Sequence, residues 1–129
     1  MKLQVVLLYA GLSGLLVFVL AMRVVLARIK ERVAIGHGDN RKVERAMRVH
    51  SNAVENIPLV LILMALLELN QAPAWNLHAA GIVFVLGRLA HASGMWKRTL
   101  GIGRRIGSAL TFLVLLGLSI ANLVFFFFR

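Results

Sequence analysis

The segment RVHSNAVENIP, residues 48–58, brings polar side chains directly into a hydrophobic run that continues through residues 59–67. At 100° per residue, Arg48, Asn52 and Glu55 fall within an arc of roughly 60° on one helix face. Ionisable groups inside a membrane are costly and usually serve to bind something. The segment therefore predicts a membrane helix with a polar face that is suited to a small zwitterionic ligand.

The composition is typical of a membrane protein. Of the 129 residues, 60% are hydrophobic, and the formal net charge is +10. The basic residues lie between apolar segments and not on one solvated face, which disfavours nucleic acid as a partner. The absence of cysteine excludes disulfides, thiolate metal sites and a cysteine nucleophile. No metal site is predicted, because His50 lies about 140° from Glu55 around a helix.

Four apolar segments predict an all-α membrane protein with a single domain over residues 1–129. The spans are expected at approximately 3–27, 44–69, 74–96 and 104–128, and each is long enough to cross a hydrocarbon core of ~30 Å. We expect the first to be a retained helix and not a signal peptide. The spans predict an antiparallel four-helix bundle, in which the pairs Ala10/Gly14 and Gly117/Ala121 permit close helix contact.

The basic residues predict the orientation of this bundle in the membrane. Residues 23–48 and 97–105 are rich in Lys and Arg, whereas the turn at 70–75 has none. The positive-inside rule then places both basic connections in the cytoplasm and both termini outside it.

A second polar cluster is expected on the third span, where Arg88 and His91 are three residues apart and share a helix face. A buried guanidinium needs an acidic partner, and Glu55 is the natural candidate. One interpretation is a structural Glu55–Arg88 pair, with Asn52 bonding across helices. The other is a ligand site, which is favoured because Arg48 and His91 exceed what a single pair needs.

Arg104 and Arg105 open the fourth span from the basic side. In a functional interpretation, one of these guanidinium groups points into a cleft of the bundle and lowers the pKa of a bound thiol. In the simpler interpretation, both residues are anchors at the membrane interface. Spacing alone favours the anchors.

The pattern Arg48-x-His50-x-Asn52-x-x-Glu55-x-x-Pro58 follows a basic first loop and precedes a leucine-rich span. In this setting it resembles the second-helix motif of the MAPEG family, the membrane-associated proteins of eicosanoid and glutathione metabolism. The segment 87–91 (GRLAH) resembles that family's third helix, and the similarity, which points to a bacterial branch, covers nearly the whole chain. The resemblance implies a homotrimer of four-helix protomers, with glutathione in a cleft between adjacent subunits.

The site residues of the family fall on matching positions of this sequence. The resemblance implies that Arg48, Asn52 and Glu55 bind glutathione. It also implies that His91 is the third-helix histidine of the site and that Arg88 is the family's buried arginine.

Three further arginines follow from the resemblance. Arg28 corresponds to a basic residue that ends the first helix and contributes to glutathione binding. In the family, the arginine that activates the glutathione thiol lies at the start of the fourth helix. The resemblance assigns this role to Arg104, with Arg105, one residue away, as the alternative.

These residues lead to two classes of function. The first is an inner-membrane transferase or peroxidase that uses glutathione and acts on lipophilic electrophiles entering from the bilayer. The alternative is a non-catalytic MAPEG-fold protein whose polar face stabilises the trimer or binds another ligand. A small transporter is less favoured, because the few acidic residues leave no obvious proton relay. The expected partners are a lipophilic small molecule, membrane lipids and further copies of the chain.

Overall fold

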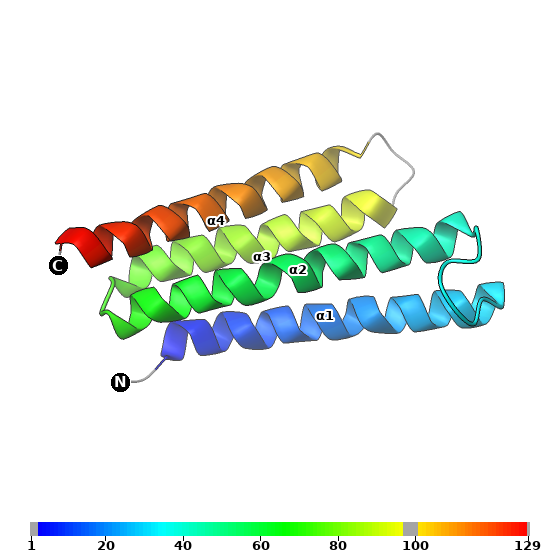
Figure 1. The fold of residues 1–129 in the computed structure, drawn as a ribbon, viewed down its shortest axis with the longest axis horizontal. Coiled ribbons are helices and arrows are strands. Elements are labelled where there is room, and N and C mark those ends of the chain that lie inside the picture. The colour runs from blue at the N-terminus through cyan, green and yellow to red at the C-terminus, as the bar shows by residue number, and fades with distance from the viewer. Residues whose placement is uncertain (1–2, 97–100, 129) are drawn as a thin grey trace.

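Four helices run antiparallel and side by side (Figure 1). A computed structural model describes residues 3–96 and 101–128. The helices are α1 (Gln4–Glu31), α2 (Arg41–Leu69), α3 (Ala74–Trp96) and α4 (Ile102–Phe128). Within the described ranges there is no strand. The predicted all-α four-helix bundle is therefore confirmed.

Three of these helices, α1, α2 and α4, are long and apolar enough by length and composition to cross a membrane. The remaining helix, α3, has 23 residues, which also suffices to cross ~30 Å of hydrocarbon. Two of its polar residues, Arg88 and His91, are buried. They face the interior of the bundle, which is where membrane helices place such groups.

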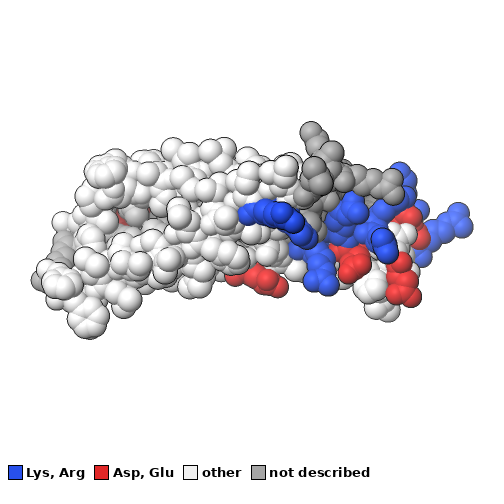
Figure 2. Space-filling model, turned by 90° about the horizontal axis from the view of Figure 1, so that it is seen from above, with Lys and Arg blue, Asp and Glu red and all other residues white. Residues whose placement is uncertain are grey.

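Charged residues gather at one end of the bundle (Figure 2). The α1–α2 loop lies at this end, whereas α1 begins and α4 ends at the opposite end, beside the short α2–α3 turn (Figure 1). The charge asymmetry expected from the sequence is thus present in the fold. The orientation of the bundle in a membrane stays a prediction.

The helices pack most extensively in the pairs α3–α4 and α1–α2, and α2 also contacts α3 and α4. Side chains that are at most 3% exposed fill the space between them, among them Tyr9, Val60, Met64, Leu77 and Phe84. Many other large apolar side chains point outward. An outer surface of this kind is typical of a protein that contacts lipid or further copies of itself.

The close approach of α3 and α4 depends on glycines. A Cβ placed on Gly107 would lie 2.5 Å from the backbone nitrogen of His91, and one on Gly94 would lie 2.6 Å from the carbonyl carbon of Gly103. These distances leave no room for a side chain, so the backbones of the two helices touch directly. Gly103 and Gly107 form the small-xxx-small pair at this contact.

The glycines of the two predicted small-residue pairs have a different environment. A Cβ on Gly14 or Gly117 would meet no described atom within 4 Å. These two glycines therefore do not bring helices together within the described part of this chain. Small-xxx-small pairs are common in membrane helices, and the sequence alone does not show which of them are used.

At the end where α1 begins, polar groups of the bundle satisfy one another. The Glu68 carboxylate accepts hydrogen bonds from the backbone N–H groups of Val5 and Val6, both at 2.8 Å. The first N–H groups of a helix have no partner within it and carry positive partial charge, so this carboxylate stabilises the start of α1. The Tyr9 hydroxyl donates to the backbone oxygen of His78 at 3.0 Å.

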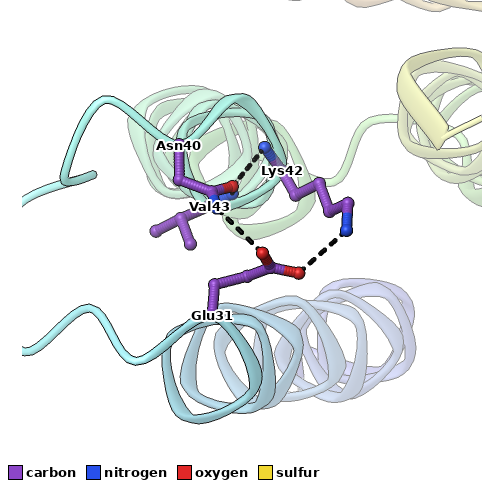
Figure 3. Close-up of polar contacts among 4 residues, drawn as sticks. All are labelled: Glu31, Asn40, Lys42 and Val43. Atoms are coloured by element: carbon purple, nitrogen blue, oxygen red, sulfur yellow. Dashed lines mark hydrogen bonds and ion pairs between the residues drawn. The ribbon is translucent and has the colours of Figure 1, made fainter.

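At the charged end, Glu31 joins the end of α1 to the start of α2 (Figure 3). Asn40 Nδ2 donates to its Oε2 atom and Lys42 Nζ to its Oε1 atom, each at 2.9 Å. Asn40 also caps α2, because its side-chain oxygen accepts from the backbone N–H groups of Lys42 and Val43. Glu31 lies beyond the apolar part of α1, and the hydrogen bonds from Lys42 and Asn40 hold its pKa below the ordinary value.

Candidate functional site

One face of α2 lines a surface pocket of about 450 Å³. Arg48, Asn52 and Glu55 lie along this pocket. The side chains of Arg48 and Glu55 are exposed, and Arg48 forms an ion pair with Glu44 at 3.6 Å. The other lining residues are His37, Glu44, Met47 and Ser51. The charged groups of the pocket are therefore accessible from outside the chain.

Arg88 reaches this face of α2 from α3. The residue is 3% exposed, and its Nη1 atom donates to Oδ1 of Asn52 at 2.6 Å. The prediction of a Glu55–Arg88 pair is wrong, since no ion pair joins these two described residues and Glu55 is exposed. Asn52 and Glu55 lie roughly 60° apart around α2, so the rotation that turns Asn52 toward α3 leaves Glu55 at the pocket surface.

The positive charge of Arg88 is not neutralised within the described residues. No carboxylate forms an ion pair with it, and its Nε atom has no hydrogen-bond partner there. Asn52 supplies a charge-assisted hydrogen bond but no negative charge. A buried guanidinium in this situation is costly, and an anion bound nearby would reduce that cost.

His91 follows Arg88 on α3 and is 6% exposed. Gly107 of α4 lies against its backbone. Both Arg104 and Arg105 are exposed near the start of α4. The backbone nitrogen of Arg104 lies against Gly94 of α3.

Arg28 is partly buried near the charged end of α1. Its Nη2 atom lies 3.6 Å from Sδ of Met47, a residue that also lines the α2 pocket. Its Nε atom is buried and has no hydrogen-bond partner among the described residues. Arg28 itself lines a separate hollow with Arg32 and Val33, so it lies outside the α2 pocket of its own chain.

The predicted site residues thus fall into two groups. Those gathered at the α2 face and the adjoining part of α3 are Arg48, Asn52, Glu55, Arg88 and His91. Of these five residues, only Arg48, Asn52 and Glu55 line the α2 pocket, whereas Arg88 and His91 are buried on α3 and do not line it. The second group, Arg28, Arg104 and Arg105, lies outside the pocket, although Arg28 contacts Met47 of its lining.

The sequence from residue 6 to residue 124 matches the MAPEG family. The chain belongs to the MAPEG family. It is 43% identical over 116 residues to the inner membrane protein YecN of Escherichia coli K12, which covers 90% of this chain and 88% of that protein. YecN of Escherichia coli O6:H1 has the same identity and coverage.

Membership of the MAPEG family agrees with the observed architecture, since the family is a membrane four-helix bundle. The family is associated in general with glutathione. The name of YecN gives a location, the inner membrane, and no reaction. The bacterial relatives therefore support an inner-membrane protein of the MAPEG family. The chemistry of the site has to be inferred from its residues.

Four residues of the pocket in this MAPEG chain were not predicted from the sequence, namely His37, Glu44, Met47 and Ser51. Glu44 and Ser51 lie within roughly 60° of Arg48 around α2, so helical periodicity was sufficient to include them. His37 belongs to the α1–α2 loop. Its place at the pocket depends on how this loop folds back over α2, which periodicity does not predict.

Proposed function

We propose that this chain is a homotrimeric, glutathione-dependent transferase or peroxidase of the inner membrane that acts on lipophilic electrophiles. The observation that carries the proposal is the exposed, charged face of α2 in an otherwise apolar bundle. Membership of a family associated with glutathione supports the choice of ligand.

The depth of Glu55 supports assembly with further copies. Glu55 lies 14 residues before the end of α2 at Leu69, which is roughly 21 Å along the helix. If Leu69 lies at one boundary of a ~30 Å hydrocarbon core, Glu55 lies about 10 Å inside the other boundary. A charged side chain that faces lipid at this depth is costly. A neighbouring copy that covers this face of α2 removes the cost and completes the pocket, which favours a homotrimer with its sites between chains.

The side chains of the pocket fit the charges of glutathione, which has two carboxylates, one ammonium group and one thiol. Arg48 is suited to a carboxylate and Glu55 to the ammonium group. Arg88 is buried and does not line the pocket, but its unneutralised charge lies against Asn52 and favours an anion bound nearby. Asn52 holds Arg88 in position, and His91 lies beside it.

Arg28 lies outside the pocket of its own chain and keeps a buried Nε atom without a partner among the described residues. In the proposed trimer, it contributes to the glutathione site across the interface between two chains.

We assign activation of the thiol to Arg104, with Arg105 as the alternative, because the backbone of Arg104 lies against Gly94 of α3. A guanidinium in a medium of low dielectric favours the thiolate over the thiol. Glutathione, when bound, would supply the sulfur nucleophile for attack on an electrophile. Together with a second glutathione, with which it would form a disulfide, it would supply the two electrons that convert a hydroperoxide into an alcohol and water. The exposed apolar side chains of the helices give a lipophilic substrate a route from the bilayer.

The proposed orientation places the charged end in the cytoplasm and both termini outside it, according to the positive-inside rule. The α2 pocket lies toward the charged end, since it includes His37 of the α1–α2 loop. Glutathione then enters the site from the cytoplasm.

Calorimetry of glutathione binding to the detergent-purified oligomer tests the ligand. Arg48→Gln removes an exposed pocket charge without loss of packing, and we expect it to weaken binding at least about tenfold, as for a lost charge-assisted hydrogen bond. Arg41→Gln is the matched control, because Arg41 is exposed on the same helix and does not line the pocket. No binding to the intact wild-type oligomer at millimolar glutathione would contradict the proposal.

Turnover of a lipophilic aryl halide and of a lipid hydroperoxide tests the catalytic assignment. We expect Arg104→Gln to lower kcat about a hundredfold while glutathione still binds, and Arg105→Gln to have a much smaller effect. The reverse result assigns the role to Arg105. Unchanged turnover in both variants would contradict activation of the thiol by these residues.

A second candidate function is a non-catalytic membrane protein of the same family, whose polar face holds the copies together or binds another ligand. It is favoured by the Asn52–Arg88 hydrogen bond and the Glu44–Arg48 ion pair, because these contacts need no ligand. The mass of the detergent-solubilised oligomer distinguishes the two. If Glu55→Gln dissociates the oligomer and wild-type protein binds no glutathione, the polar face is structural.

A further inference from the structure

A second pocket, of about 480 Å³, lies between α1 and α2 at the charged end. Glu31 and three apolar residues, among them Leu26, form part of its lining. Its basic lining residues are Arg23, Lys30, Lys42 and Arg45. No residue lines both this basic groove and the α2 pocket, although Arg45 lies only roughly 20° from Asn52 around α2. The groove is therefore separate from the candidate glutathione site.

The positive charge of the basic groove is only partly neutralised. Glu31 already receives hydrogen bonds from Lys42 on one oxygen and Asn40 on the other (Figure 3). Lys30 and Arg45 are exposed, and no hydrogen bond or ion pair joins either of them to another described residue. These two cations are available to an anionic ligand.

If Gln4 lies at one boundary of the hydrocarbon core, the groove spans the level at which hydrocarbon gives way to headgroups at the other boundary. Arg23 lies 19 residues after Gln4, or roughly 29 Å along α1, which is close to the thickness of a hydrocarbon core. Lys30 lies about two turns farther out. Leu26, between them, is 59% exposed and gives the groove an apolar wall.

We propose that the basic groove binds the phosphate group of an anionic phospholipid whose acyl chain lies along Leu26. Basic pockets between membrane helices on the cytoplasmic side are known to bind such headgroups. An anionic phospholipid places negative charge at the level of Lys30 and Arg45 and hydrocarbon directly below it. A soluble anion matches the basic side chains but not the apolar wall. The proposal does not depend on glutathione binding.

Native mass spectrometry of the oligomer tests the proposal, with phosphatidylglycerol and phosphatidylcholine of identical acyl chains supplied in equal amounts. We expect wild-type protein to retain phosphatidylglycerol preferentially. The double variant Lys30→Gln/Arg45→Gln should lose this preference by about tenfold or more, since each basic side chain near an anionic headgroup contributes about fivefold. The control Arg32→Gln/Arg41→Gln removes two charges from the same end but none from the groove, and it should retain the lipid.

Three outcomes would overturn the proposal. Equal retention of both lipids by wild-type protein excludes a headgroup site. Equal losses in the test and control variants indicate general attraction of an anionic lipid to a basic surface. Displacement of phosphatidylglycerol by millimolar inorganic phosphate indicates a site for soluble phosphate.

A second measurement distinguishes loss of lipid binding from misfolding of the Lys30→Gln/Arg45→Gln variant. In nanodiscs, replacing phosphatidylcholine by phosphatidylglycerol should raise the Tm of wild-type protein and of the control variant, because a ligand that binds the folded state stabilises it. The Lys30→Gln/Arg45→Gln variant should keep the wild-type Tm in phosphatidylcholine and gain nothing from phosphatidylglycerol. A gain equal to that of wild-type protein would contradict the site.

Discussion

Polar side chains are hydrogen-bonded to different extents at the two ends of the bundle. Where α1 begins, Glu68 gives both carboxylate oxygens to backbone N–H groups, and Tyr9 bonds to His78. Toward the charged end, Arg88 keeps an Nε atom without a partner among the described residues, and Glu55 is exposed. Polar groups that satisfy one another add stability, whereas groups with unused hydrogen-bonding capacity are available to a ligand. The first end is structural, and the second is where we expect binding.

The largest effect on stability is expected where the backbones of α3 and α4 touch. This contact also positions His91. In Gly107→Ala, the new Cβ meets the backbone of α3, and we expect a loss of about 3 kcal/mol in the free energy of unfolding. Gly14→Ala is the control, since its Cβ enters open space and alanine favours a helix by up to about 1 kcal/mol. Unfolding in micelles, followed by circular dichroism, measures both. Equal losses would contradict the contact.

The next effect concerns the neutral partner of Arg88. Asn52→Ala removes a hydrogen bond to a buried charge, and we expect a loss of about 2 kcal/mol in the free energy of unfolding. Asn52→Asp supplies the missing negative charge, so it should be at least as stable as wild-type protein and should bind glutathione more weakly. The same unfolding assay and calorimetry measure these effects. If the two variants are equally unstable, the charge of Arg88 is already neutralised by another group.

The same substitution at both ends tests the comparison directly. Glu68→Gln leaves one oxygen to accept from the two N–H groups of Val5 and Val6, and we expect a loss of about 1–2 kcal/mol. Glu55→Gln changes an exposed side chain, so its stability should stay within about 0.5 kcal/mol of wild type while glutathione affinity falls. A large loss of stability in Glu55→Gln would show that this residue is structural.

The smallest effect is expected at Glu31. Its pKa lies below the ordinary value of 4.5 in the folded chain, because Lys42 and Asn40 donate hydrogen bonds to the ionised form. Its contribution to stability is therefore present above the unfolded pKa and is lost as the pH falls through the folded pKa. Unfolding of wild-type protein and Glu31→Gln as a function of pH measures this contribution. The wild-type advantage should be present at neutral pH and vanish in acid. An advantage that persists in acid would contradict the assignment.

Helix type and the family were predictable because each depends on side chains that are close in the sequence. The apolar runs and the spacing of Arg48, Asn52 and Glu55 predicted a helix with a polar face, and the MAPEG family is confirmed. Glu44 and Ser51 belong to the same face, and the same periodicity was sufficient to find them.

The errors concern contacts between helices. The expected Glu55–Arg88 pair is wrong, because the rotation of α2 against α3 brings Asn52 to Arg88. Within the described part of this chain, the small-residue contact lies at Gly103 and Gly107, and the glycines of the pairs named from the sequence meet no other helix there. Periodicity gives the angle of a residue on its own helix but not the angle between two helices.

The sequence by itself determined the helices, their charge asymmetry and the family, since apolar length, periodicity and motif spacing are properties of the chain alone. The tertiary structure decided which polar groups are satisfied and which are left exposed or without an acidic partner. Asn52 became the partner of Arg88, and Glu68 became the cap of α1, through the packing of separate helices. Such partnerships depend on distances of a few ångströms across helix contacts, which only the packed bundle defines.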